Sequence, residues 1–412
     1  MYSLAIYIYM LGVNIAALFG NEKARLMRRG HRQTWKTLRE SIAPGDAPVW
    51  FHAASLGEFE QGRPLMERLR REQPEQKILL TFFSPSGYEV RKDYEGADVV
   101  CYLPFDTMPG ARKFLRLAHP SKAFFIKYEF WANYLFLLHR RGTPVYSVSS
   151  IFRPGQIFFR WWNCGYSVVL RWVTHYFVQN EESRQLLANQ GLENATVVGD
   201  TRFDRVVDIM RAAKPLPIAE AFARERTVIV AGSTWREDED LLLDYFNRHP
   251  DVRLLLAPHV VSEGHLQEIT GKLKRTAVRY TKTTPEEAAL ADCLIIDCYR
   301  LLSSLYRYAT VCYVGGGFGA GIHNVPEAAV YARPVLIGPN NGKFQEAQAL
   351  LENGGCREVR DQASLDAALD GLLADSDALR RAGEAAGGYI HRNAGATETI
   401  FRAVFPQVSE VG

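Results

Sequence analysis

Short apolar runs alternate with amphipathic segments along this chain, and the alternation occurs in two separate series. Strands that alternate with helices in this way form parallel sheets covered by helices. The sequence therefore predicts an α/β fold with two doubly wound sheets, whose ligands bind at the carboxyl ends of the strands. The predicted strands span residues 49–53, 77–83, 99–103, 123–126, 145–148 and 175–178, and then 227–231, 252–257, 294–297, 310–314 and 335–337.

A chain of 412 residues is also long enough for two cores. The pattern weakens near Lys214-Pro215-Leu216-Pro217, where a domain junction is expected. The last helices, in residues 376–404, are expected to pack back on the first domain. The predicted organisation is an apolar and basic segment at 1–40, a Rossmann-like domain at 41–205, a linker at 206–225 and a second Rossmann-like domain at 226–412.

The N-terminus is unusual in composition. Residues 1–20 carry no charged side chain and are mostly apolar, whereas residues 21–39 carry seven Lys or Arg against one acid, Glu22. An apolar segment followed by a basic one predicts membrane association on the cytoplasmic side, either by spanning the bilayer or by lying in its interface. A buried helix with a solvated basic continuation is the alternative.

The net charge and the cysteine content argue against nucleic-acid binding and against a zinc site. The net charge of +3 makes no case for nucleic-acid binding. The six cysteines form no Cys-x-x-Cys pair and no cluster with zinc-ligand spacing, so they are expected to be reduced in a cytosolic compartment. No bound metal and no cofactor are expected.

Two carboxylates follow predicted strands of the first domain. Glu58 ends the stretch His52-Ala-Ala-Ser-Leu-Gly-Glu58 and begins a helix, and Glu129 follows the fourth strand among aromatic residues. A carboxylate in that position can act as a general base on a hydroxyl. The alternative is that each acid only complements a helix dipole.

An aromatic segment at residues 151–173 also carries three arginines. Such a composition suits a membrane interface and an anionic, lipid-bearing acceptor, although a buried helix with exposed arginines would share it. The residues expected to contact acceptor or membrane are Arg153, Arg160, Trp161 and Trp162.

In the second domain, the turn containing Ser233 and Thr234 follows the first strand and offers amides and hydroxyls to a phosphate. His259 ends the next strand and could reach the same phosphate. The acidic run at 237–240 is interpreted as a dipole match at a helix start and not as a metal site, because successive helical carboxylates point in different directions.

The most specific pattern is a strand that runs into a glycine-rich loop, followed by His323-Asn324-Val-Pro-Glu327 and another strand. Glycines let backbone amides approach a phosphate. The loop lacks Gly-Lys-Ser/Thr, so it is not a P-loop. Glu327, one turn into the helix, is placed to accept both ribose hydroxyls of a nucleotide.

At these residues the chain resembles the transferases that attach 3-deoxy-D-manno-octulosonate (Kdo) in lipopolysaccharide biosynthesis, a family of inverting GT-B type glycosyltransferases. The resemblance spans nearly the whole chain. It is carried by the apolar and basic N-terminus and by HAASLGE at 52–58, YEFW at 128–131, VVGDTRFDRV at 198–207, AGSTWREDE at 231–239 and GGGFGAGIHNVPEAA at 315–329.

The resemblance implies metal-independent transfer of Kdo from CMP-Kdo to a glucosamine 6′-hydroxyl of an acylated lipid A precursor. This would take place at the cytoplasmic face of the bacterial inner membrane, in contact with phospholipid. It implies that Glu58 is the general base and that Glu129 is a second essential acid. On the donor side, the residues it implies are Ser233 and Thr234 at the phosphate and Gly317, Asn324 and Glu327 at the CMP site.

The chain also departs from the family's pattern. Many members have Pro-Arg-His where this chain has Ala257-Pro258-His259, so the phosphate-contacting arginine is missing, with Lys343 or Arg202 as possible replacements. The alternatives are a UDP-sugar transferase, a UDP-sugar 2-epimerase and a catalytically dead scaffold. Preferential binding of UDP over CMP would favour the UDP-sugar transferase. A soluble epimerase has no use for residues 1–39 or for the aromatic segment at 151–173, which counts against it. Intact carboxylates at 58, 129 and 327 count against the scaffold, which failure to bind any nucleotide would favour.

Overall fold

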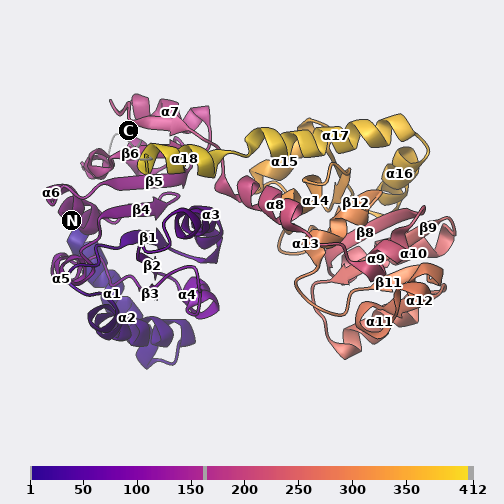
Figure 1. Ribbon diagram of the computed structural model, residues 1–412, viewed down its shortest axis with the longest axis horizontal. Helices are drawn as coiled ribbons and strands as arrows, with labels where there is room; N and C mark the ends of the chain where they lie inside the picture. Colours follow the sequence, from indigo (N-terminus) through magenta and orange to yellow (C-terminus); the bar gives the residue numbers. More distant parts are fainter. Residues whose placement is uncertain (1, 161–164, 407–412) are drawn as a thin grey trace, which may run out of the picture. The chain divides into compact units, whose positions relative to one another are not determined.

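The computed structural model describes residues 2–160 and 165–406, and the chain divides into two compact units (Figure 1). Unit 1 contains the residues up to Asp204 and those from Ala394 onward, whereas unit 2 is Arg205–Asn393. The chain therefore leaves unit 1, builds the whole of unit 2 and then returns.

Unit 1 is built on a seven-stranded parallel sheet with the strand order β3-β2-β1-β4-β5-β6-β7. In register, Val49 of β1 lies beside Ile78 of β2 on one side and beside Lys122 of β4 on the other. The strands are β1 (Val49–Ala53), β2 (Ile78–Phe82), β3 (Val99–Tyr102), β4 (Lys122–Ile126), β5 (Val145–Ser150), β6 (His175–Val178) and β7 (Ala195–Val197).

Helices cover both faces of this sheet, because successive side chains of a strand point to opposite faces. Trp50 packs against Phe114 of α5 and Tyr134 of α6, whereas its neighbour Phe51 lies in the core that α3 and α18 cover. The helices of unit 1 are α3 (Leu56–Glu72), α4 (Pro85–Arg91), α5 (Met108–Ala118), α6 (Ala132–Arg140), η1 (Ile157–Phe159), η2 (Tyr166–Trp172), α7 (Glu181–Ala188), α8 (Thr201–Ala212, which continues into unit 2) and α18 (Ala396–Val404), besides two at the N-terminus.

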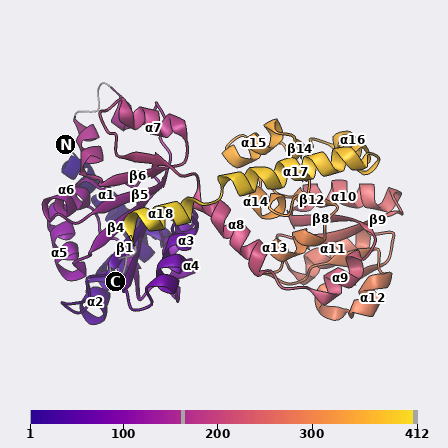
Figure 2. The ribbon, with the colours of Figure 1, turned by 45° about the horizontal axis from the view of Figure 1, so that its top comes forward.

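The C-terminal helix α18 belongs to the core of unit 1 (Figure 2). Its buried residues Ile400 and Phe401 pack with α3, and Arg68 of α3 forms an ion pair of 2.7 Å with Glu398. Asp204 accepts hydrogen bonds from the backbone N–H of Gly395 and from Thr397, so the two points where the chain crosses between units are joined.

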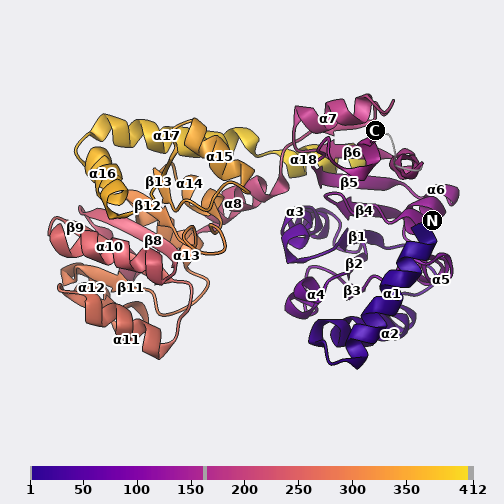
Figure 3. The ribbon, with the colours of Figure 1, turned by 180° about the vertical axis from the view of Figure 1, so that it is seen from behind.

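The N-terminal segment forms two helices, α1 (Tyr2–Leu18) and α2 (Glu22–Ser41), which contact each other (Figure 3). Tyr2 anchors α1 by donating a hydrogen bond of 2.6 Å to the buried Asp106. In residues 2–160 and 165–406, no single helix has the length and apolar composition to cross a membrane; α1 and α2 pass only as a pair bent by 116°. Of the two expected modes of membrane association, a single helix that spans the bilayer over residues 1–20 is thus not supported, because the helix ends at Leu18 and the chain turns.

Unit 2 repeats the architecture with the strand order β10-β11-β9-β8-β12-β13-β14, again entirely parallel. Its strands are β8 (Thr227–Thr234), β9 (Val252–Pro258), β10 (Ala277–Arg279), β11 (Cys293–Ile295), β12 (Val311–Val314), β13 (Val335–Ile337) and β14 (Cys356–Glu358). Its helices are α9 (Pro217–Ala223), α10 (Arg236–Arg248), α11 (Glu263–Lys272), η3 (Tyr280–Lys282), α12 (Pro285–Leu290), α13 (Leu302–Leu305), η4 (Tyr306–Tyr308), α14 (Val325–Ala329), α15 (Gln345–Glu352), α16 (Gln362–Leu373) and α17 (Ser376–Asn393).

Candidate active-site residues in the two units

Each sheet has one point at which its strand order reverses direction, and several of the predicted site residues lie there. In unit 1 this point lies between β1 and β4, which Glu58 and Glu129 follow. In unit 2 it lies between β8 and β12, which the Ser233-Thr234 turn and the glycine loop follow. Such switch points are where open α/β sheets bind ligands.

Glu58 lies in the first turn of α3 and is held on both sides of its carboxylate. The hydroxyl of Ser55, the residue before the helix, donates to Oε2 of Glu58. The Lys127 ammonium lies 3.8 Å from Oε1, and only 12% of the Glu58 side chain is exposed. The two carboxylate oxygens thus face a hydroxyl donor on one side and an ammonium on the other, which together hold the side chain in place.

Glu129 lies close enough to Glu58 for the two charges to interact. The pKa of Glu129 is raised to about 7, chiefly by burial and also by the negative charge of Glu58, whereas Trp131 and Lys127 act in the opposite direction. Unit 1 therefore holds a pair of carboxyl groups in unequal surroundings. When the surroundings of two carboxyl groups differ in this way, their pKa values move apart, and one group can act as a base while the other acts as an acid.

A buried histidine supports the loop that carries Glu129. His52 accepts a hydrogen bond of 3.1 Å at Nε2 from the indole N–H of Trp131. Since indole can only donate, the ring proton of His52 is on Nδ1 and is donated to Thr81, 2.9 Å away. Burial lowers the pKa of His52 to about 3, so the ring stays neutral and the link to Trp131 stays intact.

The residues predicted to contact acceptor or membrane lie later in the sequence than Glu58 and Glu129, and the structure describes only two of the four. Arg153 and Arg160 are exposed, and the Arg160 guanidinium donates to the backbone oxygen of Gly155. Trp161 and Trp162 lie outside the described residues. The described part of the segment forms two 3-10 helices and not a continuous α-helix.

In unit 2, Ser233 and Thr234 differ in what they can offer a ligand. Ser233 is half-buried with a φ of 53°, in the left-handed region, which turns the chain sharply at the end of β8. Thr234 is buried, and its hydroxyl donates 3.0 Å to Glu239, which also contacts His265 at 3.1 Å. The hydroxyl hydrogen of Thr234 is thus engaged by Glu239 and is not available to a ligand.

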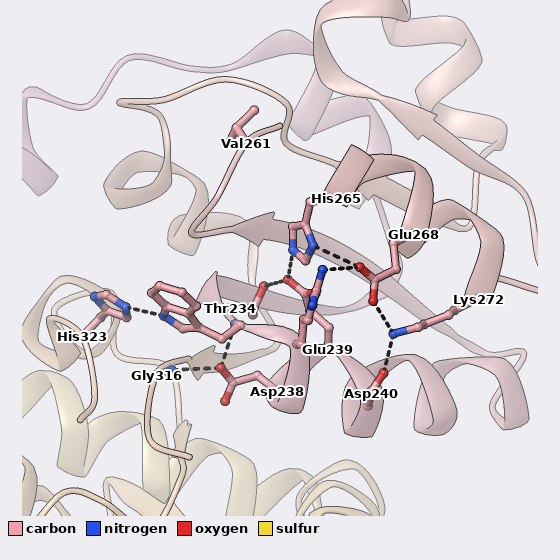
Figure 4. A network of polar contacts seen from close by, with 12 residues as sticks. Thr234, Asp238, Glu239, Asp240, Val261, His265, Glu268, Lys272, Gly316 and His323 are labelled. Atoms are coloured by element: carbon pink, nitrogen blue, oxygen red, sulfur yellow. Dashed lines mark hydrogen bonds and ion pairs between the residues drawn. The ribbon is translucent and has the colours of Figure 1, made fainter. Parts of the chain in front are cut away.

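The acidic run after this turn diverges, as the sequence predicted (Figure 4). Asp238 is fully buried and accepts hydrogen bonds from the backbone N–H groups of Trp235 and Gly316, 2.9 Å each, and from the Tyr313 hydroxyl at 2.7 Å. Asp240 instead meets Lys272 at 2.8 Å. Asp238 therefore joins the β8 turn to the glycine loop.

Three rings line the same edge of the unit 2 sheet. The Trp235 ring stacks on His259, and His259 stacks on His323, with 4.6 Å between ring centroids in each pair. The Trp235 indole also donates 3.1 Å to Nε2 of His323. Burial, and then the neighbouring His259, lower the pKa of His323, which keeps this nitrogen available as an acceptor.

The glycine loop is shaped by close backbone contacts. A Cβ on Gly315 would lie 2.5 Å from the oxygen of Ser233, and one on Gly317 would lie 2.6 Å from the Cα of Gly338. Gly317 is thus required by packing between two loops, whatever it offers to a ligand.

The predicted ribose-binding carboxylate already has one protein partner. Asn324 donates 2.7 Å to Oε1 of Glu327, which leaves the other oxygen for a hydroxyl. Burial raises the pKa of Glu327, whereas Asn324 and then the positive charge of Arg205 lower it.

Sequence reasoning did not predict the contacts of Lys127, Asp238 and Arg205 or the pairing of Trp235 with His323. The rule that parallel strands end at one edge of the sheet could have brought some of these residues together, but not Arg205, which lies within α8. The rule places Trp235, His259 and His323 together, because β8 lies between β9 and β12.

Comparison with known proteins agrees with the resemblance. The family model described as 3-deoxy-D-manno-octulosonic-acid transferase (kdotransferase) matches residues 23–205. The 3-deoxy-D-manno-octulosonic acid transferase of Bordetella pertussis is 29% identical over 385 residues, covering 88% of each chain. That of Haemophilus influenzae is 24% identical over 381 residues, again covering 88% of each.

Among solved structures, the UDP-GlcNAc 2-epimerase from Neisseria meningitidis bound to UDP-GlcNAc superimposes with a TM-score of 0.60 at 12% identity. It covers 87% of this chain and 99% of the other. This likeness shows a shared fold of two α/β domains.

Proposed function

We propose, from the family model that matches residues 23–205 and from relatives at 24–29% identity, that this chain is a glycosyltransferase of the 3-deoxy-D-manno-octulosonic acid transferase family. In this proposal it transfers Kdo from CMP-Kdo to the glucosamine 6′-hydroxyl of an acylated lipid A precursor. The observation that carries the proposal is the Glu58 carboxylate, held by Ser55 and Lys127, beside Glu129 at the switch point of unit 1. A base next to a second, more readily protonated acid suits the activation of a hydroxyl.

In the proposed reaction, unit 1 handles the acceptor. Glu58 accepts the proton of the attacking hydroxyl as the new bond forms at the anomeric carbon of Kdo with inversion. Glu129 binds the acceptor near that hydroxyl. The Ser55 hydroxyl and the Lys127 ammonium, which hold the two oxygens of Glu58, support this assignment.

Unit 2 handles the donor in this proposal. The bond between Kdo and CMP breaks as its electrons pass to the phosphate oxygen. Backbone N–H groups of the Ser233 turn, together with His259, stabilise that charge. Glu327 accepts from the ribose through its oxygen that Asn324 leaves available. We propose that no metal takes part, since Asp238, Glu239 and Asp240 are engaged by protein groups.

We also propose that α1 and α2 hold the enzyme at the cytoplasmic face of the inner membrane, lying in the interface. Large apolar side chains of α1 are exposed, including Leu4 at 64% and Leu18 at 72%. Exposed apolar surface next to a basic helix fits an anionic membrane.

The direct test incubates the protein with CMP-Kdo and a tetraacylated lipid A precursor in detergent and follows products by mass spectrometry. A mass gain of one or more Kdo units with release of CMP is expected. No product under conditions in which a control enzyme is active would contradict the proposal. Turnover with UDP-sugars in place of CMP-Kdo would favour the alternative donor class.

Replacing Glu58 tests the proposed base. Glu58→Gln is expected to lower kcat by about 10²–10⁴-fold while leaving CMP binding, measured by calorimetry, unchanged. Glu67→Gln is the matched control, because Glu67 lies on the same helix and pairs with Arg63 near solvent. Normal turnover by Glu58→Gln would remove Glu58 from the mechanism.

A further inference from the structure

The backbone of Lys127 adopts a conformation that a lysine rarely takes. Its φ is 62°, in the left-handed region, at the point where β4 ends. Two hydrogen bonds hold it there: its N–H donates 2.8 Å to the oxygen of Val148, and its own oxygen accepts 3.2 Å from the Ser147 hydroxyl. Strained backbone that the surrounding structure fixes in place is typical of functional sites.

This conformation directs the side chain toward the carboxyl pair. The ammonium lies 3.8 Å from Oε1 of Glu58, with 28% of the Lys127 side chain exposed. Its positive charge also acts on Glu129. Lys127 is thus a cation shared by two acids, with its closest approach to Glu58.

Within residues 2–160 and 165–406, few other groups interact with this pair. They are the Ser55 hydroxyl just before α3, the Trp131 indole before α6, and Tyr166 of η2, whose ionisation Glu129 opposes. His52 at the end of β1 is neutral because burial lowers its pKa to about 3. Among these groups, Lys127 is the one that brings a positive charge.

We propose that Lys127 is a positioning residue that keeps Glu58 as the charged member of the Glu58–Glu129 pair and so keeps Glu58 ready to accept the acceptor proton. The proposal rests on the proposed function for its role in the reaction. The distribution of charge within the pair can be tested separately.

The first test is the pH dependence of transfer. In Lys127→Met, the acidic limb of the kcat/KM profile is expected to move to higher pH by roughly one unit or more, as when a carboxylate loses a neighbouring cation. Activity should recover at alkaline pH, and Lys127→Arg should keep the limb near its original place. An unshifted limb in Lys127→Met would overturn the proposal.

Two controls separate charge from folding. Lys127→Gly removes the ammonium but suits the left-handed backbone, so it should fold normally and shift the limb as Lys127→Met does. Lys122→Met removes the same charge at the other end of β4, where the ammonium lies over the Phe405 ring, and should leave the limb unchanged. Equal shifts in Lys122→Met and Lys127→Met would mean that net charge alone is responsible.

The second test needs no turnover. Infrared difference spectra recorded across a pH titration report carboxyl protonation, and Glu58→Gln and Glu129→Gln assign the two groups. In Lys127→Met, the Glu58 signal should titrate at higher pH than in the unsubstituted protein. If this shift appears without any Kdo transfer, the proposed function fails but the charge assignment holds; if transfer occurs and the signal does not move, Lys127 has no such role.

Discussion

At the scale of single residues, Glu129 makes the stability of unit 1 depend on pH. Its pKa is raised from 4.5 to about 7 in the folded chain, chiefly by burial. A carboxyl whose folded pKa is raised favours the folded state when protonated. The free energy of unfolding should therefore fall as pH rises from about 4.5 to 7, as the buried Glu129 ionises. Above that range it should stay at its lower value, because the charged carboxylate destabilises the folded state.

Removing the charge of Glu129 should remove this penalty. Glu129→Gln is expected to unfold with a free energy about 1–3 kcal/mol higher than the unsubstituted protein at pH 8, and with little difference at pH 4.5. Chemical unfolding at both pH values measures the effect. The exposed Glu182, replaced by Gln, should show no such pH-dependent gain. A gain of equal size at both pH values would contradict the assignment.

Asp238 joins two loops of unit 2 through three hydrogen bonds to its buried carboxylate. Asp238→Asn should lower the free energy of unfolding by about 1–3 kcal/mol, because a charged acceptor is lost while buried donors remain. CMP affinity should fall with it, as measured by calorimetry. Asp240→Asn, whose carboxylate meets Lys272 near solvent, should change stability by less than about 1 kcal/mol.

The strand ends near which these residues lie could be predicted from the sequence, but the side chains that contact these residues could not. Helix starts and glycine loops are local patterns, so Glu58, Ser233 and Glu327 could be placed near strand ends. The Lys127–Glu58 and Asp238–Gly316 contacts join residues far apart in the chain, and they follow only once the strand order is known.

At the scale of elements, the predicted strands are confirmed, whereas three were missed. The missed strands are β7, β10 and β14, each of three residues, and each is at the edge of its sheet. An edge strand is covered less than a central one, so it lacks the continuous apolar run that marks a buried parallel strand. The residues 206–225, expected to be a linker, contain most of α8 and all of α9.

The helix α1 exposes a stripe of apolar side chains at helical spacing, Leu4, Ile8 and Leu11, each more than half exposed. Replacing all three by Ser should weaken binding to vesicles of anionic phospholipid by more than tenfold, since burying each such side chain contributes up to about 1.5–3 kcal/mol. Sedimentation with vesicles measures the binding. Leu290→Ser, in unit 2 and 83% exposed, should bind as before. Undiminished binding of the triple variant would exclude α1 as the contact.

At the scale of the whole molecule, α18 makes the core of unit 1 depend on the last residues of the chain. Ile400→Ala should destabilise unit 1 by about 2–5 kcal/mol. Hydrogen exchange with mass spectrometry should show faster exchange in α3 and in the unit 1 strands, with the peptides of unit 2 unchanged. Arg402→Ala, on the exposed side of α18, should have little effect. Faster exchange in both units would contradict a role confined to unit 1.

Because the chain passes from unit 1 to unit 2 and back, the two parts of unit 1 are synthesised at different times. During synthesis, the first 204 residues emerge without the helix that completes their core, and all of unit 2 must be translated before that helix appears. At about 5–20 residues per second, the delay is roughly ten to forty seconds. For that time the apolar surface of α3 that faces α18 has no partner, so a nascent chain stalled within unit 2 should be a substrate for chaperones.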